Sequence, residues 1–330
     1  MRIAFHGENA ASFAEGFESL AGDGAQVSVL PDVLATGADR ACYADAEYIV
    51  GVKFDASLPV PSGLKLFHVP GAGYDAVDLQ LLPASATVCN CFGHEQAIAE
   101  YVMSAILMRH VPIADADQRL RRGDWKYWAG ALDRVHGELA GKTIGLLGFG
   151  HIGKAIAARA KAFEMRVHVA NRSAVATSGI VDEACKLDRL SAFWGTADYI
   201  VVSVPLAAET NGIVGLEAFA AMRPDAVVIN VGRGPTVDER SLYAALKSGR
   251  IAGAIIDTWY AYPGPNNASP QPSLLPFNEL SNVVMTPHMS GWTHGTIRRR
   301  QQTIAGNIVR AAQGKPCKTS SGMDPRKLHQ

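Results

Sequence analysis

The sequence predicts an α/β protein built from two doubly wound parallel sheets, and two observations lead to this prediction. Short apolar runs alternate with helix-forming stretches along the chain, which is the pattern of parallel strands joined by helical crossovers. A glycine-rich turn follows one such run near the middle of the chain. Because a dinucleotide-binding sheet begins just before its glycine turn, the residues that precede it must form a separate α/β unit.

The predicted strands are short runs rich in apolar residues, and two stretches between them have the periodicity of helices. The strands span Arg2 to His6, Tyr48 to Val52, Leu64 to Val69, Val88 to Asn90, Thr143 to Leu147, Arg166 to Ala170, Tyr199 to Val204, Ala226 to Val231, Gly253 to Asp257 and Val283 to Thr286. The helices span Glu95 to Arg109, which links the two sheets, and Lys154 to Ala162, which follows the glycine turn.

Charge and hydropathy exclude several classes of protein. The chain carries 31 basic and 31 acidic residues, so we expect no electrostatic binding to nucleic acid or to a membrane surface. The run Arg298 to Arg300 is interpreted as a solvated helix face. No apolar run approaches the roughly 18 residues of a membrane-spanning helix, and the first residues are typical of a strand rather than a signal peptide. We therefore expect a soluble, cytoplasmic protein.

The five cysteines, at positions 42, 89, 91, 185 and 317, show no spacing typical of a zinc site. An odd number of cysteines in a long chain fits a reducing compartment, and we expect no metal site. Cys89 and Cys91 flank Asn90 and face the same side of a predicted strand. We interpret them as small core residues rather than as a redox pair.

The stretch Thr143 to Gly153, TIGLLGFGHIG, has the order of strand, Gly-x-Gly-x-x-Gly turn and helix that a dinucleotide pyrophosphate requires. The first glycine allows a tight turn, the second lets the backbone approach the phosphates, and the third packs the helix against its strand. The helix N-terminus then faces the anion. The predicted contacts of this turn are Gly148, Gly150, His151, Ile152 and Gly153.

Three further strand ends carry chemistry, at the place where open parallel sheets bind their ligands. Asn230 to Gly234, NVGRG, puts an arginine between two glycines, and a guanidinium binds a carboxylate through two parallel hydrogen bonds. Another strand ends in Asp257, and a third leads to His288, a side chain suited to proton transfer near neutral pH. Taken singly, Arg233 could be a surface charge, Asp257 a helix cap and His288 a turn residue. Their joint order behind the glycine turn favours a site.

With these motifs the chain resembles the D-isomer-specific 2-hydroxyacid dehydrogenase family, which also contains formate and phosphite dehydrogenases. The resemblance rests on LLGFGHIG at 146 to 153, VPLAAETNGIV at 204 to 214, NVGRGPTVDERSL at 230 to 242, AIIDTW at 254 to 259 and TPHMSGWT at 286 to 293. It implies a flavodoxin-like substrate domain from residues 1–95 plus 290–330, around an inserted Rossmann domain from residues 96–289 that binds NAD(P).

The resemblance implies an oxidoreductase that interconverts a small-molecule 2-oxo acid and its D-2-hydroxy acid. By that match Arg233 holds the substrate carboxylate and carbonyl, His288 is the general acid/base, and Asp257 contacts the nicotinamide side of the cofactor. The loop containing Ala72 and Gly73 offers backbone amides to the substrate carboxylate. The other implied cofactor contacts are Val204, Pro205, Thr210, Val231, Gly232 and Gly291.

The family commonly dimerises through its nucleotide domain, so the resemblance also implies a homodimer. Trp125, Tyr127 and Trp128 lie just before that domain. They either form a dimer contact or cleft wall, or pack against a helix of the same chain.

The chain departs from the family pattern at Tyr262. The usual run after the aspartate is Asp-x-x-x-x-Glu-Pro, in which the glutamate raises the pKa of the catalytic histidine, whereas Tyr262 stands at that position here. A phenol orients an imidazole but supplies no negative charge to stabilise imidazolium. This departure keeps a second hypothesis open, a dinucleotide-sensing binding protein on the same scaffold with weak or lost catalysis.

Two other positions are informative. His94 stands where the family often has an asparagine, so it either contacts substrate or is a surface or capping residue. At the end of the second nucleotide-binding strand, Asn171, Arg172 and Ser173 replace the acid that accepts hydrogen bonds from the ribose of NAD. Without that acid, and with an arginine and a serine available for a 2′-phosphate, the sequence favours NADP over NAD.

Overall fold

The computed structural model describes residues 1–264 and 267–318. The chain forms two compact units: one contains Met1–His94 and the chain from Trp292 onward, and the other contains Glu95–Gly291. Residues 319–330, which the sequence assigns to the substrate domain, lie outside the described part. Because the first unit uses both ends of the chain, the second unit is an insertion within it.

The first unit contains a five-stranded sheet in the order β2-β1-β3-β4-β5, in which every pairing is parallel. Its strands are β1 (Arg2–His6), β2 (Gln26–Leu30), β3 (Tyr48–Gly51), β4 (Leu66–His68) and β5 (Thr87–Cys89). Its helices are α1 (Glu8–Ala11), α2 (Phe17–Ala21), α3 (Gly37–Ala44) and α10 (His294–Ala312).

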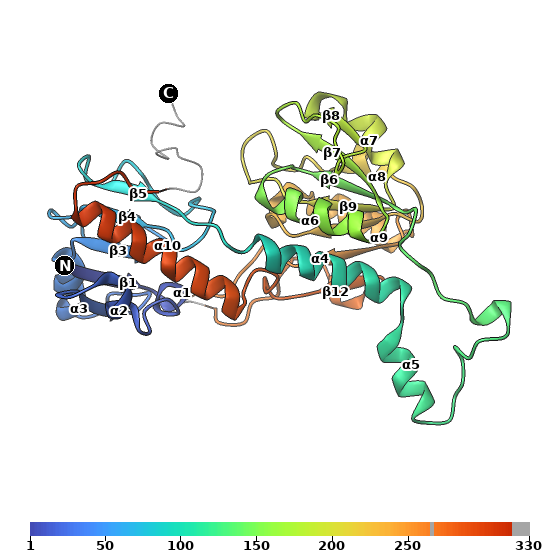
Figure 1. Cartoon of the computed structure of the whole chain (residues 1–330), viewed down its shortest axis with the longest axis horizontal. Helices are drawn as coiled ribbons and strands as arrows, with labels where there is room; N and C mark the ends of the chain where they lie inside the picture. Colours follow the sequence, from blue (N-terminus) through green and yellow to red (C-terminus); the bar gives the residue numbers. More distant parts are fainter. Residues whose placement is uncertain (265–266, 319–330) are drawn as a thin grey trace. The chain divides into compact units, whose positions relative to one another are not determined.

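Helices cover both faces of this sheet because successive strand residues point to opposite sides. Phe5 and Val50 pack with α1, α2 and α10 on one face, whereas Ala4 and Ile49 pack with Tyr43 of α3 on the other. The long helix α10 lies along the first of these faces (Figure 1). The C-terminal helix thus completes the core that the first residues of the chain begin.

The second unit contains a seven-stranded parallel sheet in the order β12-β11-β10-β9-β6-β7-β8. Its strands are β6 (Thr143–Leu147), β7 (Arg166–Asn171), β8 (Glu183–Lys186), β9 (Tyr199–Val202), β10 (Val227–Asn230), β11 (Gly253–Ile256) and β12 (Val283–Met285). Its helices are α4 (Glu95–His110), α5 (Ile113–Leu120), α6 (His151–Ala162), α7 (Leu190–Thr196), α8 (Leu216–Ala221) and α9 (Glu239–Lys247), with short 3-10 turns at Leu132–Arg134, Leu187–Arg189, Gly234–Thr236 and Phe277–Glu279.

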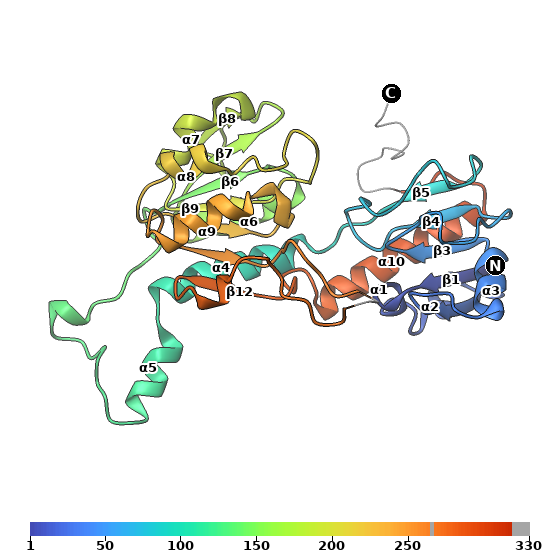
Figure 2. The ribbon, with the colours of Figure 1, turned by 180° about the vertical axis from the view of Figure 1, so that it is seen from behind.

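The seven-stranded sheet is also covered on both faces. Buried residues of α4 and α6 pack on one face, and those of α7, α8 and α9 pack on the other. α5 is different, because none of its residues is buried. Figures 1 and 2 both show α5 and the loop that follows it extending away from the sheet of this unit.

The predicted fold class, an α/β protein with two parallel sheets, is confirmed. Two strands were missed. β2 has the alternating sequence QVSVL, a signal that the sequence analysis overlooked, whereas β8 is the polar sequence EACK at a sheet edge. Such a short edge strand is defined by its pairing with β7 and carries no distinctive pattern of its own.

The interpretation of Arg298 to Arg300 as a solvated helix face is wrong for Arg300. Its side chain is 9% exposed, and its Nε donates a hydrogen bond to the carbonyl oxygen of Phe92. Arg299 donates in the same way to Gly93. These arginines hold the backbone that follows β5, because each gives a charged donor to the main-chain carbonyl of a half-buried residue.

Within the described residues, no single helix is long and apolar enough to cross a membrane. α4 and α5 taken together have the length and apolar composition of a membrane span, but the chain bends by 49° at the break between them.

Candidate active site

The predicted cofactor and catalytic positions of the second unit follow the carboxyl ends of its parallel strands. Backbone hydrogen bonds join these segments to their neighbours: Gly148 donates to Ala170, Ser203 to Leu147, Val231 to Val202, Asp257 to Asn230 and Thr286 to Ile256. The fold therefore brings residues from six strand ends to one edge of the sheet, where a ligand of an open parallel sheet binds.

The glycine turn has the close packing that its sequence predicts. α6 begins at His151 with Gly150 as its N-cap, so no cap side chain stands in front of the first amides of the helix. Gly148 has φ 100°, and a Cβ on Gly153 would lie 2.4 Å from the Gly148 carbonyl oxygen. A Cβ on Gly150 would meet no atom within 4 Å. The turn thus leaves space at Gly150 and at the helix N-terminus, which fits a pyrophosphate.

Asn171 ties the glycine turn to the end of β7. Its Oδ1 accepts from the backbone N–H of Phe149, and its Nδ2 donates to the carbonyl of Ser173. Arg172 is 82% exposed, and its Nη1 lies 3.6 Å from Oε1 of Glu209, in the loop after β9. The arginine is therefore open to a ligand but has a carboxylate as a competitor.

The loop after β9 is closed by Thr210, whose buried hydroxyl accepts from the N–H of Ala207 and donates to the carbonyl of Pro205 at 2.6 Å. Val204, at the start of this loop, is buried. These contacts keep the segment from Val204 to Thr210 compact beside the glycine turn, where the Val204 side chain lies close to Gly148.

The turn that carries Arg233 is held by Asn230, a residue to which the sequence analysis assigned no role. Its Oδ1 accepts from the N–H of Gly232, and its Nδ2 donates to the carbonyl of Arg233. The hydroxyl of Thr236 donates to the same carbonyl at 2.6 Å. Arg233 itself is half-buried, and its Nη1 donates to the carbonyl of Gly232. The backbone of this arginine is thus fixed on both sides.

Asp257 holds the loop that carries His288. The aspartate is fully buried, and its Oδ1 accepts from the hydroxyl of Thr286 at 2.6 Å and from the N–H of Met289 at 2.9 Å. Its Oδ2 accepts from the N–H of Ser290 at 3.0 Å. His288 has φ 57°, a left-handed conformation that is costly for a side chain larger than glycine. The hydrogen bonds to Asp257 on either side stabilise that conformation.

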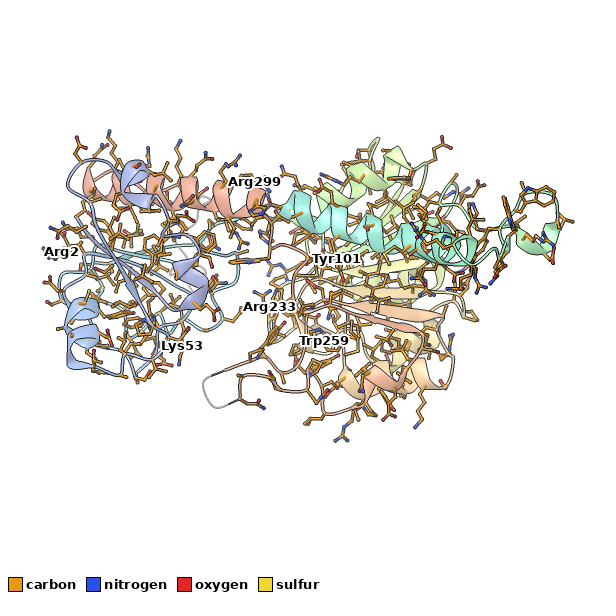
Figure 3. The ribbon with its side chains drawn as sticks, turned by 90° about the horizontal axis from the view of Figure 1, so that it is seen from below. Arg2, Lys53, Tyr101, Arg233, Trp259 and Arg299 are labelled. Carbon is orange, nitrogen blue, oxygen red and sulfur yellow. The ribbon has the colours of Figure 1, made fainter. Side chains whose placement is uncertain are left out.

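Thr286 connects this loop to the helix layer. Its Oγ1 lies 2.7 Å from the hydroxyl oxygen of Tyr101 on α4, and its carbonyl accepts from Nε1 of the buried Trp259. Figure 3 labels Tyr101, Trp259 and Arg233, all of which belong to the second unit. Sequence reasoning missed Tyr101 and gave Thr286 no role, although Thr286 stands in the TPH motif itself.

Tyr262 lies beside His288, with ring centroids 5.5 Å apart and a tilt of 50°. Its hydroxyl oxygen accepts from the N–H of Trp259 at 3.0 Å. Burial of the hydroxyl raises the pKa of Tyr262 above its ordinary value, and the negative charge of Asp257 acts in the same direction, whereas Arg233 and the Trp259 hydrogen bond oppose them. The phenol is therefore neutral at neutral pH, and it contacts the imidazole without providing an anion.

Ala72, Gly73 and His94 lie in the first unit, after the carboxyl ends of β4 and β5. The two segments are joined, because Nδ2 of Asn90 donates to the carbonyl of Ala72 at 2.8 Å. His94 is 8% exposed, which excludes the surface alternative, and its ring stacks on Phe92 with centroids 6.4 Å apart.

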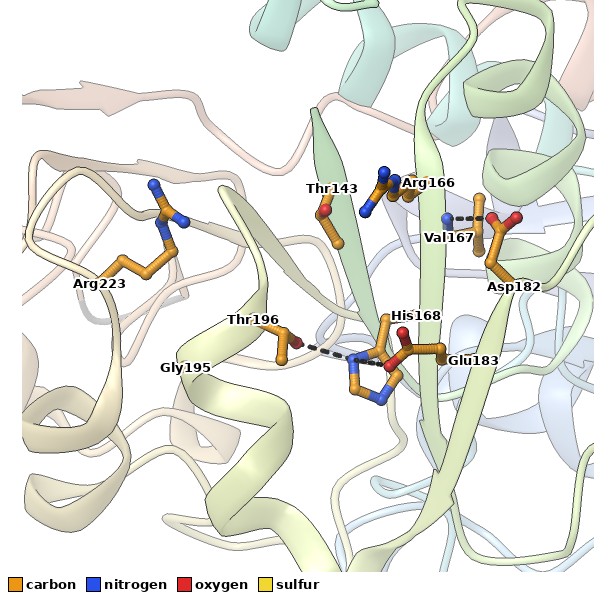
Figure 4. A pocket seen from close by; sticks show the side chains of 9 residues that line it. All are labelled: Thr143, Arg166, Val167, His168, Asp182, Glu183, Gly195, Thr196 and Arg223. Atoms are coloured by element: carbon orange, nitrogen blue, oxygen red, sulfur yellow. Dashed lines mark hydrogen bonds and ion pairs between the residues drawn. The ribbon is translucent and has the colours of Figure 1, made fainter. Parts of the chain in front are cut away.

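A cavity of about 230 Å³ lies at the opposite edge of the seven-stranded sheet. It is lined at the amino ends of β6, β7 and β8 (Figure 4). Nδ1 of His168 lies 2.7 Å from Oγ1 of Thr196, and burial lowers the pKa of this histidine, so its ring is neutral at neutral pH. Arg223, also on the lining, pairs with Asp225. None of the predicted site residues borders this cavity.

Among residues 1–264 and 267–318, no three histidine, cysteine, aspartate or glutamate side chains are grouped in a way that could hold a metal ion.

Residues 103–290 match the model of the D-isomer specific 2-hydroxyacid dehydrogenase NAD-binding domain, more than half of the chain. The chain belongs to the D-isomer specific 2-hydroxyacid dehydrogenase family. The predicted resemblance is confirmed, and the protein is an NAD(P)-dependent enzyme of the dehydrogenase and 2-oxoacid reductase class that the family comprises.

Three relatives illustrate the similarity. The glyoxylate/hydroxypyruvate reductase B of Salmonella schwarzengrund is 34% identical over 273 residues, 79% of this chain and 78% of the relative. A dehydrogenase of this family from Xanthobacter autotrophicus Py2, solved with NADPH and MES, is 28% identical with a TM-score of 0.76 and covers 98% of each chain. The NADPH-dependent glyoxylate/hydroxypyruvate reductase of Sinorhizobium meliloti, solved with citrate, is 27% identical with a TM-score of 0.74 and covers 96% of each chain.

The glycine turn of this dehydrogenase gives the first prediction. Gly153→Ala forces a Cβ against the Gly148 carbonyl, and such overpacking costs about 1–3 kcal/mol, so the thermal midpoint falls. Gly150→Ala fits the folded chain but occupies the space that a pyrophosphate approaches, so stability is kept while dinucleotide affinity falls by about tenfold or more. Thermal melts and fluorescence titration with NADPH measure both. Unchanged affinity in Gly150→Ala would contradict this assignment of the turn.

Proposed function

We propose that this dehydrogenase interconverts a 2-oxo acid and its D-2-hydroxy acid, with Arg233 and His288 acting on the substrate. The observation that carries the proposal is the sheet order β12-β11-β10, which sets these two residues at strand ends on either side of Asp257. In this assignment the unit Glu95–Gly291 binds the dinucleotide, and the unit formed by both chain ends contributes to substrate binding.

Arg233 binds the substrate carboxylate and polarises its carbonyl. A guanidinium forms two parallel hydrogen bonds with a carboxylate, and its positive charge stabilises the negative charge that develops on the carbonyl oxygen. Two features support this role: the side chain is half-buried, and Asn230 and Thr236 fix its backbone. Ala72 and Gly73 are proposed to donate backbone amides to the substrate, with His94 as a further contact.

His288 transfers the proton. In reduction it donates to the carbonyl oxygen, and in oxidation it accepts the proton of the hydroxyl group. Asp257 acts through this histidine as well as toward the cofactor, because its two oxygens already hold the segment from Thr286 to Ser290.

A bound nicotinamide dinucleotide supplies or accepts the hydride in this chemistry. The residues proposed to hold it are the glycine turn, the end of β7, and the segments after β9, β10, β11 and β12. They are Gly148, Gly150, His151, Ile152, Gly153, Asn171, Arg172, Ser173, Val204, Pro205, Thr210, Val231, Gly232, Asp257 and Gly291.

The function is tested by the turnover of a panel of 2-oxo acids that includes glyoxylate and hydroxypyruvate, each with NADPH and with NADH. We expect reduction of at least one member, and a loss of about 10²–10⁴-fold in kcat/KM in His288→Gln, because general acid catalysis contributes that much. Arg233→Ala should raise KM and lower kcat together. Tight dinucleotide binding without any turnover would favour the second hypothesis, a dinucleotide sensor on the same scaffold.

We propose that NADP is the preferred cofactor. Asn171 stands in place of an acid and uses both ends of its amide within the chain, while the exposed Arg172 is available to a 2′-phosphate. Two related structures support this choice: the Xanthobacter enzyme was solved with NADPH, and the Sinorhizobium reductase is NADPH-dependent.

Removing the positive charge of Arg172 should reverse the preference for NADPH over NADH. Arg172→Ala loses a hydrogen bond to a charged group, worth about 1.5–3 kcal/mol, so the ratio of kcat/KM for NADPH to that for NADH should fall roughly 10- to 100-fold. Glu209→Gln removes the competing carboxylate and should raise the same ratio. The values for NADH serve as the internal control, since neither change should alter them strongly. A clear preference of the unmodified enzyme for NADH would overturn the proposal.

We propose that Tyr262 replaces the usual glutamate as a neutral neighbour of His288, so the imidazolium form lacks an anionic partner at this position. In reduction, activity is lost as pH rises through the pKa of His288, because the histidine must carry a proton. Tyr262→Glu adds a carboxylate, which raises this pKa and moves the loss to higher pH. A shift of about one unit corresponds to ~1.4 kcal/mol.

Tyr262→Gln is the matched control for this pH profile, because it changes size and polarity without adding charge. The profile of kcat/KM against pH should shift in Tyr262→Glu and stay in place in Tyr262→Gln. Equal profiles in the two variants would show that the charge at this position does not control the proton transfer.

We propose that the enzyme is a homodimer that buries the projecting segment formed by α5 and the loop after it. Ile113, Trp125, Trp128, Leu132 and Val135 are between 58% and 92% exposed there, so the interpretation of the two tryptophans as packed within one chain is not supported. The segment is nevertheless ordered by side-chain contacts, since the hydroxyl of Tyr127 donates to Asp115. Apolar side chains on an ordered surface are typical of an interface.

The dimer is tested by light scattering after gel filtration. We expect a mass of twice 35.1 kDa, and a shift toward 35.1 kDa when Trp128→Ser and Leu132→Ser are combined. Leu274→Ser is the control, because Leu274 is 96% exposed outside this segment. A monomeric unmodified protein would contradict the proposal.

A further inference from the structure

The C-terminal segment brings a cysteine to the buried edge of the five-stranded sheet. Cys317 follows α10, and its side chain is in hydrogen-bond contact with that of Cys89, the last residue of β5. Cys89 is fully buried in the core between the sheet and α10, and Cys317 packs on the same core while remaining partly exposed. Sequence spacing gives no hint of this pair, because its members are far apart along the chain.

Several contacts hold Cys317 in this position. Its Sγ donates to the carbonyl of Asn307 on α10 at 3.6 Å, and the next residue, Lys318, donates its N–H to Oδ1 of Asn307 at 2.8 Å. On the preceding side, Nε of Arg310 donates to the carbonyl of Pro316 at 2.7 Å. The segment carrying Cys317 is therefore anchored to α10 on both sides of the cysteine.

Asn307 is itself part of a buried network. Its Nδ2 lies 3.1 Å from Nε2 of His68, and Nδ1 of His68 lies 3.0 Å from the carbonyl of Val69. Because a carbonyl only accepts, Nδ1 carries the proton and Nε2 accepts from the amide. Burial lowers the pKa of His68 to about 4, so the ring is neutral at neutral pH. The network gives Asn307 one orientation, which leaves its Oδ1 for Lys318.

The chemical surroundings of Cys317 differ from those of a buried structural thiol. The hydrogen bond from Cys89 lowers the pKa of Cys317, and the positive charge of Arg310 adds to this effect, while partial burial opposes it. A partly exposed thiol whose pKa is lowered, next to a second thiol, is the arrangement found in redox-sensing proteins.

We propose that Cys317 and Cys89 form a reversible intramolecular disulfide when a hydroperoxide oxidises Cys317. The Cys317 thiolate attacks one oxygen of the peroxide, the O–O bond breaks, and a sulfenic acid and an alcohol or water result. The Cys89 sulfur then attacks the sulfenic sulfur, so the S–S bond forms, the S–O bond breaks, and the Cys89 proton leaves with the hydroxide as water. The two sulfurs are oxidised by two electrons and the peroxide is reduced by two.

The position of Cys91 does not make it the partner of Cys317 in this disulfide. It is fully buried on the same side of the chain as Cys89, and its Sγ donates to the carbonyl of Val69 at 3.7 Å. Cys42 and Cys185 are partly exposed in other places, Cys185 on β8 of the other unit. Because their exposure is similar to that of Cys317, Cys42 and Cys185 serve as control thiols for its oxidation.

The disulfide has a route to the substrate, which rests on the proposed function. Cys89 precedes Asn90, whose side chain donates to the carbonyl of Ala72, and the N–H of Cys91 donates to the carbonyl of Gly71. The residues after β5 therefore hold the loop proposed to bind the substrate carboxylate. Because the S–S bond is about 2.05 Å long, closing it draws the sulfurs of Cys89 and Cys317 closer than hydrogen-bond contact. We expect the KM for the 2-oxo acid to rise several-fold and the KM for the dinucleotide to stay unchanged.

The site is tested on the full-length protein by intact mass and peptide mapping after treatment with hydrogen peroxide. We expect the loss of two hydrogen atoms, a cross-linked peptide pair containing Cys89 and Cys317, and full reversal by dithiothreitol. Cys317→Ser, on the partly exposed segment, should abolish the cross-link, whereas Cys42→Ser and Cys185→Ser should retain it. In Cys89→Ala the sulfenic acid on Cys317 should persist and react with dimedone.

Three results would overturn the proposal: a cross-link between other cysteines, a cross-link that survives Cys317→Ser, or oxidation of Cys317 to sulfinic acid in the unmodified protein. None of these readouts depends on turnover, so they stand even if no 2-oxo acid is reduced. The link to the substrate is tested separately by kinetics before and after oxidation. A raised KM in the unmodified protein and not in Cys317→Ser supports it, and equal KM values would refute it.

Discussion

The arrangement of the candidate active site depends on one buried carboxylate. Asp257 accepts hydrogen bonds from a hydroxyl and two backbone amides of the segment from Thr286 to Ser290, and it is fully buried. A buried carboxylate is costly unless each oxygen is paired, and these donors meet that requirement. In return, the carboxylate holds His288 in a left-handed backbone conformation that the residue would not adopt by itself. The same hydrogen bonds thus offset two costs, the backbone strain at His288 and the burial of the Asp257 carboxylate.

This arrangement links the site to the packing of the whole second unit. Thr286, which donates to Asp257, also meets the hydroxyl of Tyr101 on α4, and its carbonyl accepts from the Trp259 indole. α4 in turn packs with α6, the helix that begins at the glycine turn. A hydrogen bond thus connects the histidine loop to the helix layer that packs beside the glycine turn, and the position of His288 depends on contacts with residues far from it in sequence.

Tyr262 gives His288 a ring contact in place of a charged neighbour. The phenol is neutral at neutral pH, because an ordinary tyrosine pKa lies near 10 and partial burial moves the pKa of Tyr262 further up. Its oxygen already accepts from the N–H of Trp259. Its ring then contributes contact rather than charge. Asp257 and Arg233 both act electrostatically on this tyrosine, with opposite signs. In the proposed function, this neutral neighbour of His288 takes the place of the glutamate in the family pattern.

The sequence by itself determined the fold class, the glycine turn and the order of the strand-end motifs, because these are set by local patterns: alternation of strand and helix, glycines at fixed spacing, and polar residues that end apolar runs. Cys89 and Cys91 were also correctly interpreted as core residues. The roles assigned to the site residues stay predictions. Only the tertiary structure decided that both oxygens of Asp257 hold the histidine loop, that Arg300 is buried, that β8 is a strand, and that Cys317 meets Cys89. Each of these depends on contacts between residues distant in sequence, whose partners no local pattern specifies.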